Sequence, residues 1–253
     1  MNVLITGANG FLGKGMVEQF EKYDDYKLRL MDIIPSESVH EVYVGDVSIY
    51  EQCYDALDGI DGIIIGHMAP RGENDINYST PEMAFDVNVK GTANLFHAAV
   101  QRGIKKIVVI SSEATLGAYK KSDQVHTLRA KPLAGYYGLS KGCQELMAEH
   151  FAGEFDDLQI ACLRVGYILD GENNLDKYGR HIGVRNLGNT DRRDIGEVAR
   201  LSLESDKLKF EIFHVMSTKE SLERWDVQYT CDFLNWKAQY DFSWLPRAEI
   251  NDF

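Results

Sequence analysis

The 253-residue sequence has few cysteines, few histidines and fewer basic than acidic side chains. Its four cysteines are scattered without a CxxC spacing, which predicts reduced thiols rather than a disulfide framework or a zinc site. The seven histidines are equally dispersed, so we expect no metal site. Lysine and arginine total 27 against 39 acidic residues, a formal net charge of −12. Nucleic-acid surfaces need clustered basic side chains, so nucleic acid is excluded as a partner.

Long apolar runs are also missing. The sequence begins with the strand-length run Asn2-Val-Leu-Ile-Thr6, which glycines follow, and it has no basic segment before an apolar stretch. These features predict neither a signal peptide nor a membrane span. Together with the scattered cysteines, they lead us to expect a cytoplasmic protein with no membrane partner.

Strand-like and helix-like segments alternate along the chain. Apolar or β-branched runs occupy residues 3–6, 27–32, 42–44, 63–65, 107–111 and 160–165, and helical stretches are expected at 11–22, 49–57, 81–101 and 137–155. This alternation predicts a parallel sheet with helices on both faces, which is an α/β, Rossmann-type, doubly wound fold.

The regular alternation of strand-like and helix-like segments ends after residue 165. We expect an NAD-binding Rossmann domain over residues 1–165 and a small C-terminal substrate-binding region over 166–253, partly integrated with the first. Residues 171–191 are polar and rich in Gly and Asn, which is typical of a substrate loop or mobile stretch. Further on, residues 194–203 and 225–234 look helical, and residues 210–216 look like a strand.

The segment Thr6-Gly-Ala-Asn-Gly-Phe-Leu-Gly13 joins the first predicted strand to the first predicted helix. Gly7 allows a tight turn, Gly10 lets the backbone approach a pyrophosphate, and Gly13 allows the helix to pack closely on the strand. The helix amino terminus adds free N–H groups and the positive end of its dipole. The predicted cofactor contacts in this loop are Gly7, Asn9, Gly10, Phe11, Leu12 and Gly13.

Two acids follow the next predicted strands. Asp32 lies about 20 residues beyond the glycines, where its carboxylate would accept hydrogen bonds from the adenosine ribose and repel a 2′-phosphate. The next residue is Ile33 rather than arginine, so the pattern favours NAD over NADP. The alternative for Asp32 is an ordinary solvated acid at a strand end. Asp46 is expected either to contact adenine or simply to form a turn.

Tyr137 and Lys141 lie four residues apart, on one face of a predicted helix. The same spacing at Tyr23 and Lys27 is a chance match before the second strand, whereas Tyr137 begins a helix at the sheet edge that binds ligands. A phenol has a pKa of about 10, and a neighbouring ammonium group would stabilise the phenolate as a base. Ser112, at a strand end, would bind the reacting oxygen, or its hydroxyl would be satisfied by backbone.

These residues together resemble the extended short-chain dehydrogenase/epimerase family over nearly the whole chain. The glycine loop, Gly45-Asp-Val47, Asn88, Ser111-Ser112 and the Tyr137–Lys141 pair stand in family order, and Leu163-Arg-Val-Gly166 and Arg193-Asp-Ile-Gly-Glu-Val198 match later landmarks. The resemblance implies that Ser112, Tyr137 and Lys141 form the catalytic set. The cofactor contacts it implies outside the loop are Asp32, Asp46, Val47, Gly66, His67, Met68, Asn88, Tyr137 and Lys141.

Within that family, the chain looks most like the uronate dehydrogenases, which oxidise a hexuronic acid at C1 with NAD. The likeness includes Leu28-Arg-Leu-Met-Asp32, Tyr136-Tyr-Gly-Leu-Ser-Lys141 and Phe233-Leu-Asn-Trp-Lys237. The short stretch after Val165 offers little material to enclose the nucleotide half of a sugar nucleotide. A free sugar or sugar acid is therefore the favoured substrate.

The chain departs from the uronate enzymes where they contact substrate. Glu113 stands where they have asparagine, and Tyr167-Ile168 stands where they have small polar residues. A carboxylate at position 113 would bind sugar hydroxyls but repel a nearby substrate acid. Arg180 is the candidate to hold a substrate carboxylate. The predicted substrate contacts are Ser111, Ser112, Glu113, Tyr167 and Arg180.

We therefore expect an NAD-dependent oxidoreductase acting on a hydroxyl or carbonyl of a free sugar, sugar acid or similar small polyol. One alternative is a sugar-nucleotide epimerase, dehydratase or ketoreductase, although the acid pair of the dehydratases is incomplete at Glu113-Ala114. Another is a non-catalytic dinucleotide-sensing protein, which would not need Ser112, Tyr137 and Lys141 together. The resemblance also implies a homodimer or higher homo-oligomer, formed through helices 81–101 and 137–155.

Overall fold

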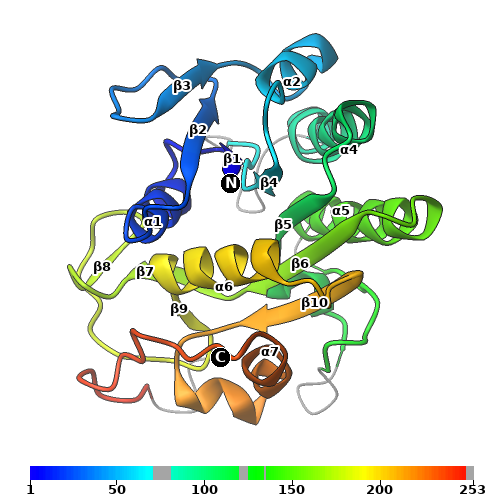
Figure 1. The fold of residues 1–253 in the computed structure, drawn as a ribbon. Coiled ribbons are helices and arrows are strands. Elements are labelled where there is room, and N and C mark those ends of the chain that lie inside the picture. Colours follow the sequence, from blue (N-terminus) through cyan, green and yellow to red (C-terminus); the bar gives the residue numbers. More distant parts are fainter. Residues whose placement is uncertain (71–80, 120–124, 134, 249–253) are drawn as a thin grey trace.

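The computed structural model describes residues 1–70, 81–119, 125–133 and 135–248 (Figure 1). Within these ranges, a parallel seven-stranded sheet has the order β10-β6-β5-β4-β1-β2-β3. Its strands are β1 (Asn2–Thr6), β2 (Lys27–Asp32), β3 (Glu41–Val44), β4 (Gly62–Ile65), β5 (Lys106–Ser112), β6 (Gln159–Val165) and β10 (Phe210–Val215). The predicted Rossmann-type doubly wound fold is confirmed.

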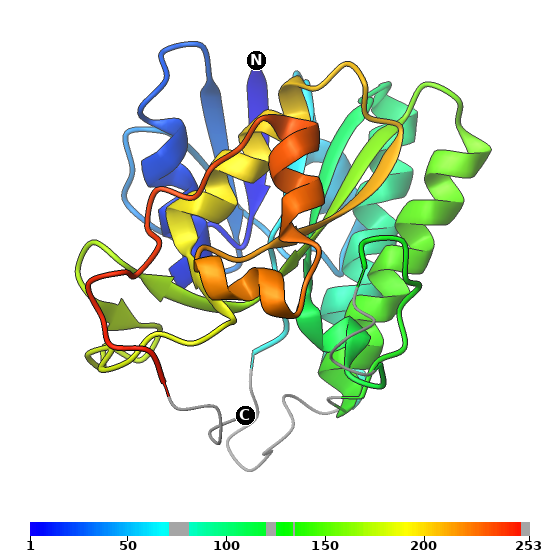
Figure 2. The same ribbon diagram turned by 90° about the horizontal axis from the view of Figure 1, so that it is seen from below.

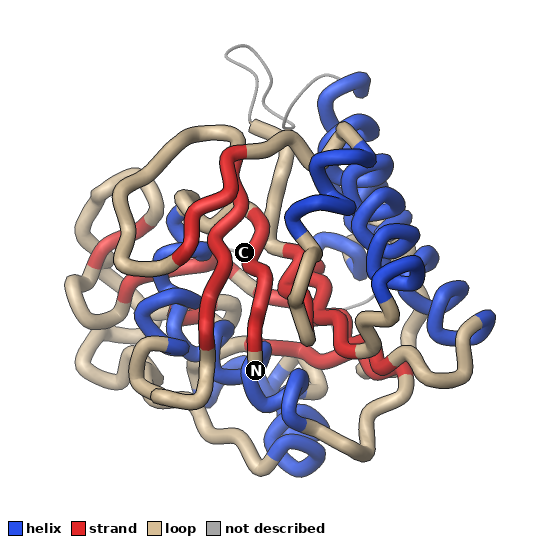
Figure 3. Tube along the Cα trace, turned by 45° about the horizontal axis from the view of Figure 1, so that its top comes forward, coloured by secondary structure: helices blue, strands red, loops and turns tan. Residues whose placement is uncertain are grey.

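Helices cover both faces of this sheet (Figure 3). One face packs against α1 (Phe11–Phe20), α6 (Arg192–Glu204) and α7 (Val227–Leu234), and Figure 2 shows α6 and α7 lying in front of the strands. The other face packs against α2 (Tyr50–Ala56), α4 (Gly91–Arg102) and α5 (Gly135–Glu154). Each face therefore has its own hydrophobic core.

The sequence of the central strands explains these two cores. Successive side chains of a strand point to opposite faces, so Val108 and Ile110 of β5 join the core under α1 and α6, while Ile107 and Val109 join the other. All four are at most 4% exposed. Burying each such side chain stabilises the fold by about 1.5–3 kcal/mol. A strand buried on both faces reads as a continuous apolar run.

Two segments differ from their predicted forms. The helix expected at 81–101 consists of α3 (Pro81–Met83), the π-helical segment η1 (Ala84–Lys90) and α4, and Gly103 ends it with a φ of 71°. The predicted loop at 171–191 contains β8 (Leu175–Asp176) and β9 (Asn189–Asp191). Both pair with β7 (Tyr167–Asp170) in a small sheet of order β8-β7-β9. The predicted loop is wrong in this respect, because parallel pairing of β7 with β9 joins residues far apart in sequence.

The residues after 165 are interleaved with those before them. β10 pairs with β6 along its whole length, and α6 packs against α1. Two single turns of 3₁₀-helix complete the described elements, η2 (Glu113–Leu116) after β5 and η4 (Lys219–Glu223) before α7. The C-terminal part thus supplies an edge strand and a covering helix to the Rossmann core.

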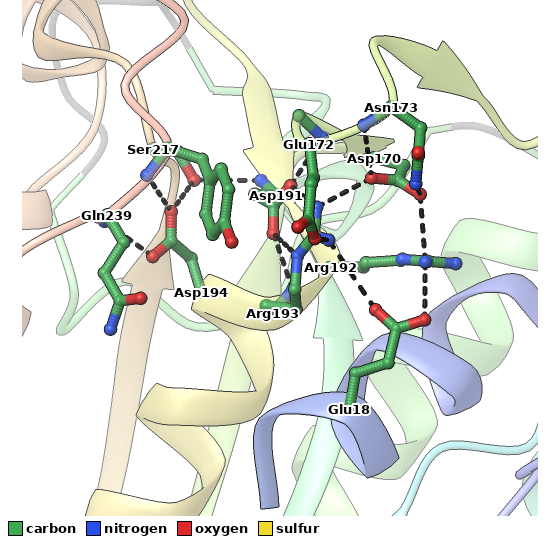
Figure 4. Close-up of polar contacts among 12 residues, drawn as sticks. Glu18, Asp170, Glu172, Asn173, Asp191, Arg192, Arg193, Asp194, Ser217 and Gln239 are labelled. Carbon is green, nitrogen blue, oxygen red and sulfur yellow. Dashed lines mark hydrogen bonds and ion pairs between the residues drawn. The ribbon is translucent and has the colours of Figure 1, made fainter. Parts of the chain in front are cut away.

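A cluster of buried charges joins α6 to α1 and to the small sheet (Figure 4). Arg192 contacts Glu18 of α1 at 2.6 Å and Asp170 of β7 at 2.9 Å. Arg193 contacts Asp170 at 2.7 Å and Asp191 of β9 at 3.0 Å, and its side chain is 2% exposed. These ion pairs fix the small sheet, and with it Tyr167, against the helix that follows the glycine loop.

Candidate active site

A cavity of about 440 Å³ opens at the carboxyl edge of the large sheet. Its walls come from the ends of β1, β2, β4, β5 and β6, from the start of α5 and from Lys177. Parallel strands end at a common edge, which is why α/β sheets bind ligands there. A larger cavity, of about 720 Å³, lies between residues 126–132, α5, β10 and α7, and its described lining includes none of the predicted cofactor residues.

Most of the predicted site residues line the smaller cavity. They are Gly7, Gly10, Phe11, Leu12, Gly13, Asp32, Gly66, Met68, Ser111, Ser112, Glu113, Tyr137, Lys141 and Tyr167. Among the described lining residues, those that were not predicted are Ile110, Ala114, Val165, Gly166, Ile168 and Lys177. The predicted residues outside its described lining are Asn9, Asp46, Val47, His67, Asn88 and Arg180.

The glycine loop fits a bound dinucleotide. Gly7 has a φ of +70°, and a Cβ there would lie 2.8 Å from the Cα of His67. A Cβ on Gly13 would lie 2.4 Å from the carbonyl oxygen of Gly7. Helix α1 has Gly10 as its N-cap, with no side-chain cap and no acid in its first turn. Its start, Gly10 to Gly13, lines the cavity, where uncapped N–H groups and the positive dipole end suit a pyrophosphate.

Asp32 is held in a fixed orientation at the end of β2. Its Oδ2 accepts a hydrogen bond from the Asn9 backbone N–H at 3.0 Å, and its Oδ1 accepts one from the Ile34 N–H at 3.2 Å. Asn9 thus acts on the cavity through Asp32. A carboxylate has several acceptor positions, so Asp32 retains the capacity to bind two ribose hydroxyls.

Asp46 and Val47 are occupied in local structure. Asp46 Oδ1 accepts a hydrogen bond from the Ser48 N–H at 2.8 Å, which matches the turn-forming interpretation. The Val47 carbonyl accepts one from the Asn94 side chain at 2.9 Å.

Two buried polar residues brace the segment that follows β4. Asn88 Oδ1 accepts from the Ala69 N–H at 2.7 Å, and its Nδ2 donates to Ser140 Oγ at 2.9 Å. His67 Nδ1 lies 2.9 Å from Thr6 Oγ1. Burial, with Lys141 adding to its effect, lowers the pKa of His67 to about 3, so the ring is neutral. Both residues position backbone around the cavity.

Ser112, Tyr137 and Lys141 meet at the cavity from two elements. Lys141 is 3% exposed, and its Nζ donates to the Ile110 carbonyl at 2.8 Å. Burial lowers the pKa of Lys141 to about 8, although the Glu145 carboxylate opposes the change. Ser112 Oγ accepts from the Ala114 N–H at 3.2 Å. A hydroxyl that accepts one hydrogen bond can still donate another, so Ser112 can serve a substrate oxygen.

The far end of the cavity is lined by Glu113, Tyr167, Ile168 and Lys177. Burial raises the pKa of Glu113, and Arg224 opposes this effect. No hydrogen bond or ion pair connects the Glu113 carboxylate with another side chain in the described part of the chain. The carboxylate is thus placed to receive hydroxyl groups of a ligand.

Arg180 is not part of the described lining of this cavity, although it lies beside Tyr167. Its guanidinium pairs with Asp176 at 2.7 Å, and its side chain is 67% exposed. Lys177, three residues earlier, brings a positive charge to the cavity instead. The basic residues of the 171–191 segment are visible in the sequence, but which of them reaches the cavity depends on how β8 pairs with β7.

Neither a metal centre nor a membrane segment is evident in the described ranges. They contain no group of three or more His, Cys, Asp or Glu side chains able to hold a metal ion. Among the helices described, none has both the length and the apolar character needed to cross a membrane.

Comparison with known proteins gives a family and a fold. Residues 3–181 match the family described as the NAD dependent epimerase/dehydratase family. Uronate dehydrogenase of Pseudomonas syringae pv. tomato is 29% identical over 169 residues, covering 65% of this chain and 58% of that protein. NAD-dependent glucose-6-phosphate dehydrogenase of Haloferax volcanii is 30% identical over 191 residues, covering 65% of this chain and 67% of that protein. The chain thus spans less than two thirds of the uronate dehydrogenase it matches.

The fold also matches a solved structure. Uronate dehydrogenase from Agrobacterium tumefaciens, crystallised as a variant complexed with NAD, superimposes with a TM-score of 0.77 at 24% identity, covering 99% of this chain and 92% of that one. The family match extends from β1 to the small sheet and includes the glycine loop, Asp32 and the α5 residues of the cavity. The chain therefore belongs to the NAD dependent epimerase/dehydratase family, and its cofactor is NAD.

Proposed function

We propose that the chain is an NAD-dependent short-chain dehydrogenase/reductase that interconverts a hydroxyl and a carbonyl on a free sugar, a sugar acid or a similar small polyol. The observation that carries this proposal is a single cavity, lined by the glycine loop and Asp32 and also by Ser112, Tyr137 and Lys141. Relatives named as uronate and glucose-6-phosphate dehydrogenases support a sugar-like substrate.

The residues of the chain have distinct tasks toward the cofactor. The amino terminus of α1 would bind the pyrophosphate, and Asp32 would accept hydrogen bonds from the adenosine ribose. Lys141 would hold the second ribose, next to the reacting carbon. NAD, when bound, supplies the acceptor for a hydride from the substrate.

Proton transfer falls to Tyr137. Its phenolate would take the proton from the substrate hydroxyl while a hydride leaves the same carbon, so that the alcohol becomes a carbonyl. The buried ammonium of Lys141 would stabilise the phenolate. Ser112 would donate a hydrogen bond to the substrate oxygen and hold it within reach of Tyr137. With a cyclic sugar oxidised at C1, the product is a lactone.

A sugar-nucleotide epimerase, dehydratase or ketoreductase is the alternative that the family description supports. It would begin with the same oxidation. The dehydratase branch needs a second carboxylate after the acid at position 113, and Ala114 lines the cavity there instead. This substitution favours simple oxidation or reduction over elimination of water.

The deciding experiment is turnover. Purified protein is mixed with NAD or NADP and a panel of uronic acids, aldoses, polyols and sugar nucleotides, and NADH formation is followed by absorbance. We expect NAD-linked turnover of a free sugar or sugar acid, and we expect Tyr137→Phe to abolish it while NADH still binds. A fully active Tyr137→Phe variant would contradict the mechanism. Tight NADH binding without turnover of any compound would instead support a dinucleotide sensor.

We also propose a cytoplasmic homodimer or higher homo-oligomer. The described cysteines are all free, which fits a reducing compartment. Helix α5 exposes a stripe of apolar side chains, with Tyr136, Leu139 and Leu146 each more than 40% exposed. Apolar residues spaced along one helix face are typical of a contact surface.

A further inference from the structure

Helix α5 carries a third polar residue on the face that presents Tyr137 and Lys141. Glu145 follows Lys141 by four residues, as Lys141 follows Tyr137, and residues at this spacing share a helix face. Glu145 is 3% exposed. A buried carboxylate is costly unless it is paired and hydrogen-bonded, so its partners indicate its purpose.

The charge of Glu145 is balanced by Arg164 of β6, which is fully buried. Arg164 Nε lies 2.9 Å from Oε1 of Glu145, and its Nη2 lies 2.8 Å from Oε2, so the pairing is bidentate. Such a pair is geometrically specific. It anchors the middle of α5 to β6 of the central sheet.

The same carboxylate also reaches both sides of Ser112. Ser111 Oγ donates to Glu145 Oε1 at 2.6 Å, and Thr115 Oγ1 lies 3.3 Å from that oxygen. Thr115 Oγ1 also donates to the Ser112 carbonyl at 2.8 Å. Ser112 is therefore flanked by Ser111, which donates to Glu145, and by Thr115, which donates to the Ser112 carbonyl while its oxygen packs beside the same carboxylate. The Arg164 pair alone would not require either contact.

Glu145 is also the carboxylate that acts on Lys141. The Lys141 Nζ donates to a neutral carbonyl at Ile110, and the titratable groups around it are Tyr137 and Glu145 of α5, Cys162 and Arg164 of β6, and His67 beside β4. Burial raises the pKa of Cys162 well above its usual range, so its thiol is neutral, as the ring of His67 is. The negative charge that favours the ammonium form comes from Glu145.

We propose that Glu145 is a positioning residue of the active site. Held by Arg164, its carboxylate fixes the end of β5 that carries Ser112 relative to the helix that carries Tyr137 and Lys141, and it sustains the charge of Lys141. This inference rests on the proposed function and adds to it the device that aligns the three catalytic groups.

The main test replaces the whole ion pair, because removing one partner would leave an unpaired buried charge. In Glu145→Leu/Arg164→Met, apolar side chains of similar size fill the space, and such replacements are often neutral for stability. We expect a folded protein that binds NADH as the wild type does but has kcat lowered about 100-fold, since small misplacements of reacting groups cost about that much. Wild-type kcat in this double variant would overturn the proposal.

A matched pair of single variants tests the proposal even if the double variant does not fold. Thr115→Val and Thr230→Val each remove a fully buried hydroxyl that donates to a backbone carbonyl at 2.8 Å. The acceptor of Thr115 is Ser112 at the cavity, whereas the acceptor of Thr230 is His214 in the edge strand β10. We expect similar losses of stability, with a fall in kcat of about tenfold for Thr115→Val alone. Equal effects of the two variants on kcat would show that Thr115 is merely structural and would overturn the proposal.

A readout without substrate separates this inference from the proposed function. Ionisation of Tyr137 is followed by ultraviolet difference absorbance between each protein and its Tyr137→Phe counterpart. Loss of Glu145 should weaken the ammonium form of Lys141, so Tyr137 in the double variant should ionise at higher pH than in the wild type. An unchanged ionisation would overturn the proposal, even if no substrate were found, whereas a shift without turnover would contradict only the proposed function.

Discussion

Glu113 directly follows Ser112 and faces the same cavity as Tyr137. A carboxylate there can accept hydrogen bonds from neighbouring hydroxyls of a sugar. It repels a substrate carboxylate whenever it is ionised, because like charges a few ångströms apart interact unfavourably by about 4 kcal/mol at an effective dielectric constant of about 20. Arg224 partly offsets the charge of Glu113. Charge at position 113 should thus decide between neutral and acidic sugars.

We predict that Glu113→Gln raises kcat/KM for uronic acids about tenfold relative to the matching aldoses. Because burial raises the pKa of Glu113, its repulsive charge is present above that pKa and is lost as the pH falls through it. The wild-type preference for aldose should therefore weaken toward acidic pH, whereas the preference of Glu113→Gln should change little. The measurement is kcat/KM for both sugars across pH. A pH-independent preference in the wild type would assign selectivity to other residues.

At the scale of the element, the turn from β1 into α1 requires glycine, because its close backbone approach leaves no room for a Cβ atom. Gly13 sits in the first turn of α1, where a Cβ would lie 2.4 Å from the Gly7 carbonyl oxygen and 2.5 Å from that of Ala8. Backbone atoms cannot give way as a flexible side chain can, so the helix would have to move from the strand. The N–H groups at the start of the helix would move with it.

Gly13→Ala should therefore lose NADH binding by at least tenfold and lower the melting temperature. Gly153→Ala is its control, since Gly153 lies near the end of α5 and a Cβ there would have nothing within 4 Å. Alanine there should stabilise the protein by about 0.5–1 kcal/mol and leave binding unchanged. The comparison uses NADH fluorescence titration and thermal unfolding. Equal NADH affinity in both variants would contradict the role given to Gly13.

The junction between α6 and the small sheet depends on the charge cluster of Figure 4. Arg193 neutralises Asp170 and Asp191, whose side chains are 5% and 0% exposed. Arg193→Met should destabilise the protein by about 3–5 kcal/mol, because it leaves the Asp191 carboxylate buried without its ion-pair partner and leaves Asp170 paired only with Arg192. Arg180→Met removes an arginine that is 67% exposed, while the backbone N–H groups of Tyr178 and Arg180 still donate to Asp176, so it should cost at most about 1 kcal/mol. Urea unfolding of both variants measures the difference, and similar values would show that the cluster contributes little.

At the scale of the whole molecule, the exposed apolar side chains indicate where copies of the chain would associate. Leu146 is 61% exposed on α5, and Leu222 is 54% exposed on η4. If copies associate through α4 and α5, Leu146→Glu places a charge in the contact and should yield monomers. Leu222→Glu makes the same change elsewhere and should leave the assembly intact. Sedimentation velocity distinguishes the two, and an unchanged oligomer in Leu146→Glu would move the interface to another face.

The sequence was sufficient to predict the parallel sheet and its helices, because strands buried on both faces are short continuous apolar runs. The glycine loop, Asp32, Ser112, Tyr137 and Lys141 were also identifiable as a group, since each follows or ends such a run or begins the next helix. Their roles in catalysis stay predictions. The link between β7 and β9, by contrast, joins Tyr167 with Asn189. No local pattern indicates such a pairing.

Long-range packing also decided which polar residues reach the cavity. Lys177 and Arg180 are close in sequence and similar in chemistry, yet the turn beside β8 directs one into the cavity and the other to Asp176. Asn88 is likewise turned toward Ala69 and Ser140 rather than the cavity. The residue types identified these side chains as candidate ligand contacts. Contacts with residues distant in sequence decided which of them reach the cavity.

The order in which the two cores are completed has a consequence for synthesis. The face of β1, β4 and β5 that carries Val3, Ile64 and Val108 is closed by α6, whose Ile195 and Val198 lie far along the chain. The opposite face already has α2, α4 and α5 when β6 is made. A chain emerging from the ribosome thus has one face of the sheet covered by three helices and the other covered only by α1, with much of its apolar surface exposed to water. Until α6 arrives, that side is a natural target for chaperones and for aggregation.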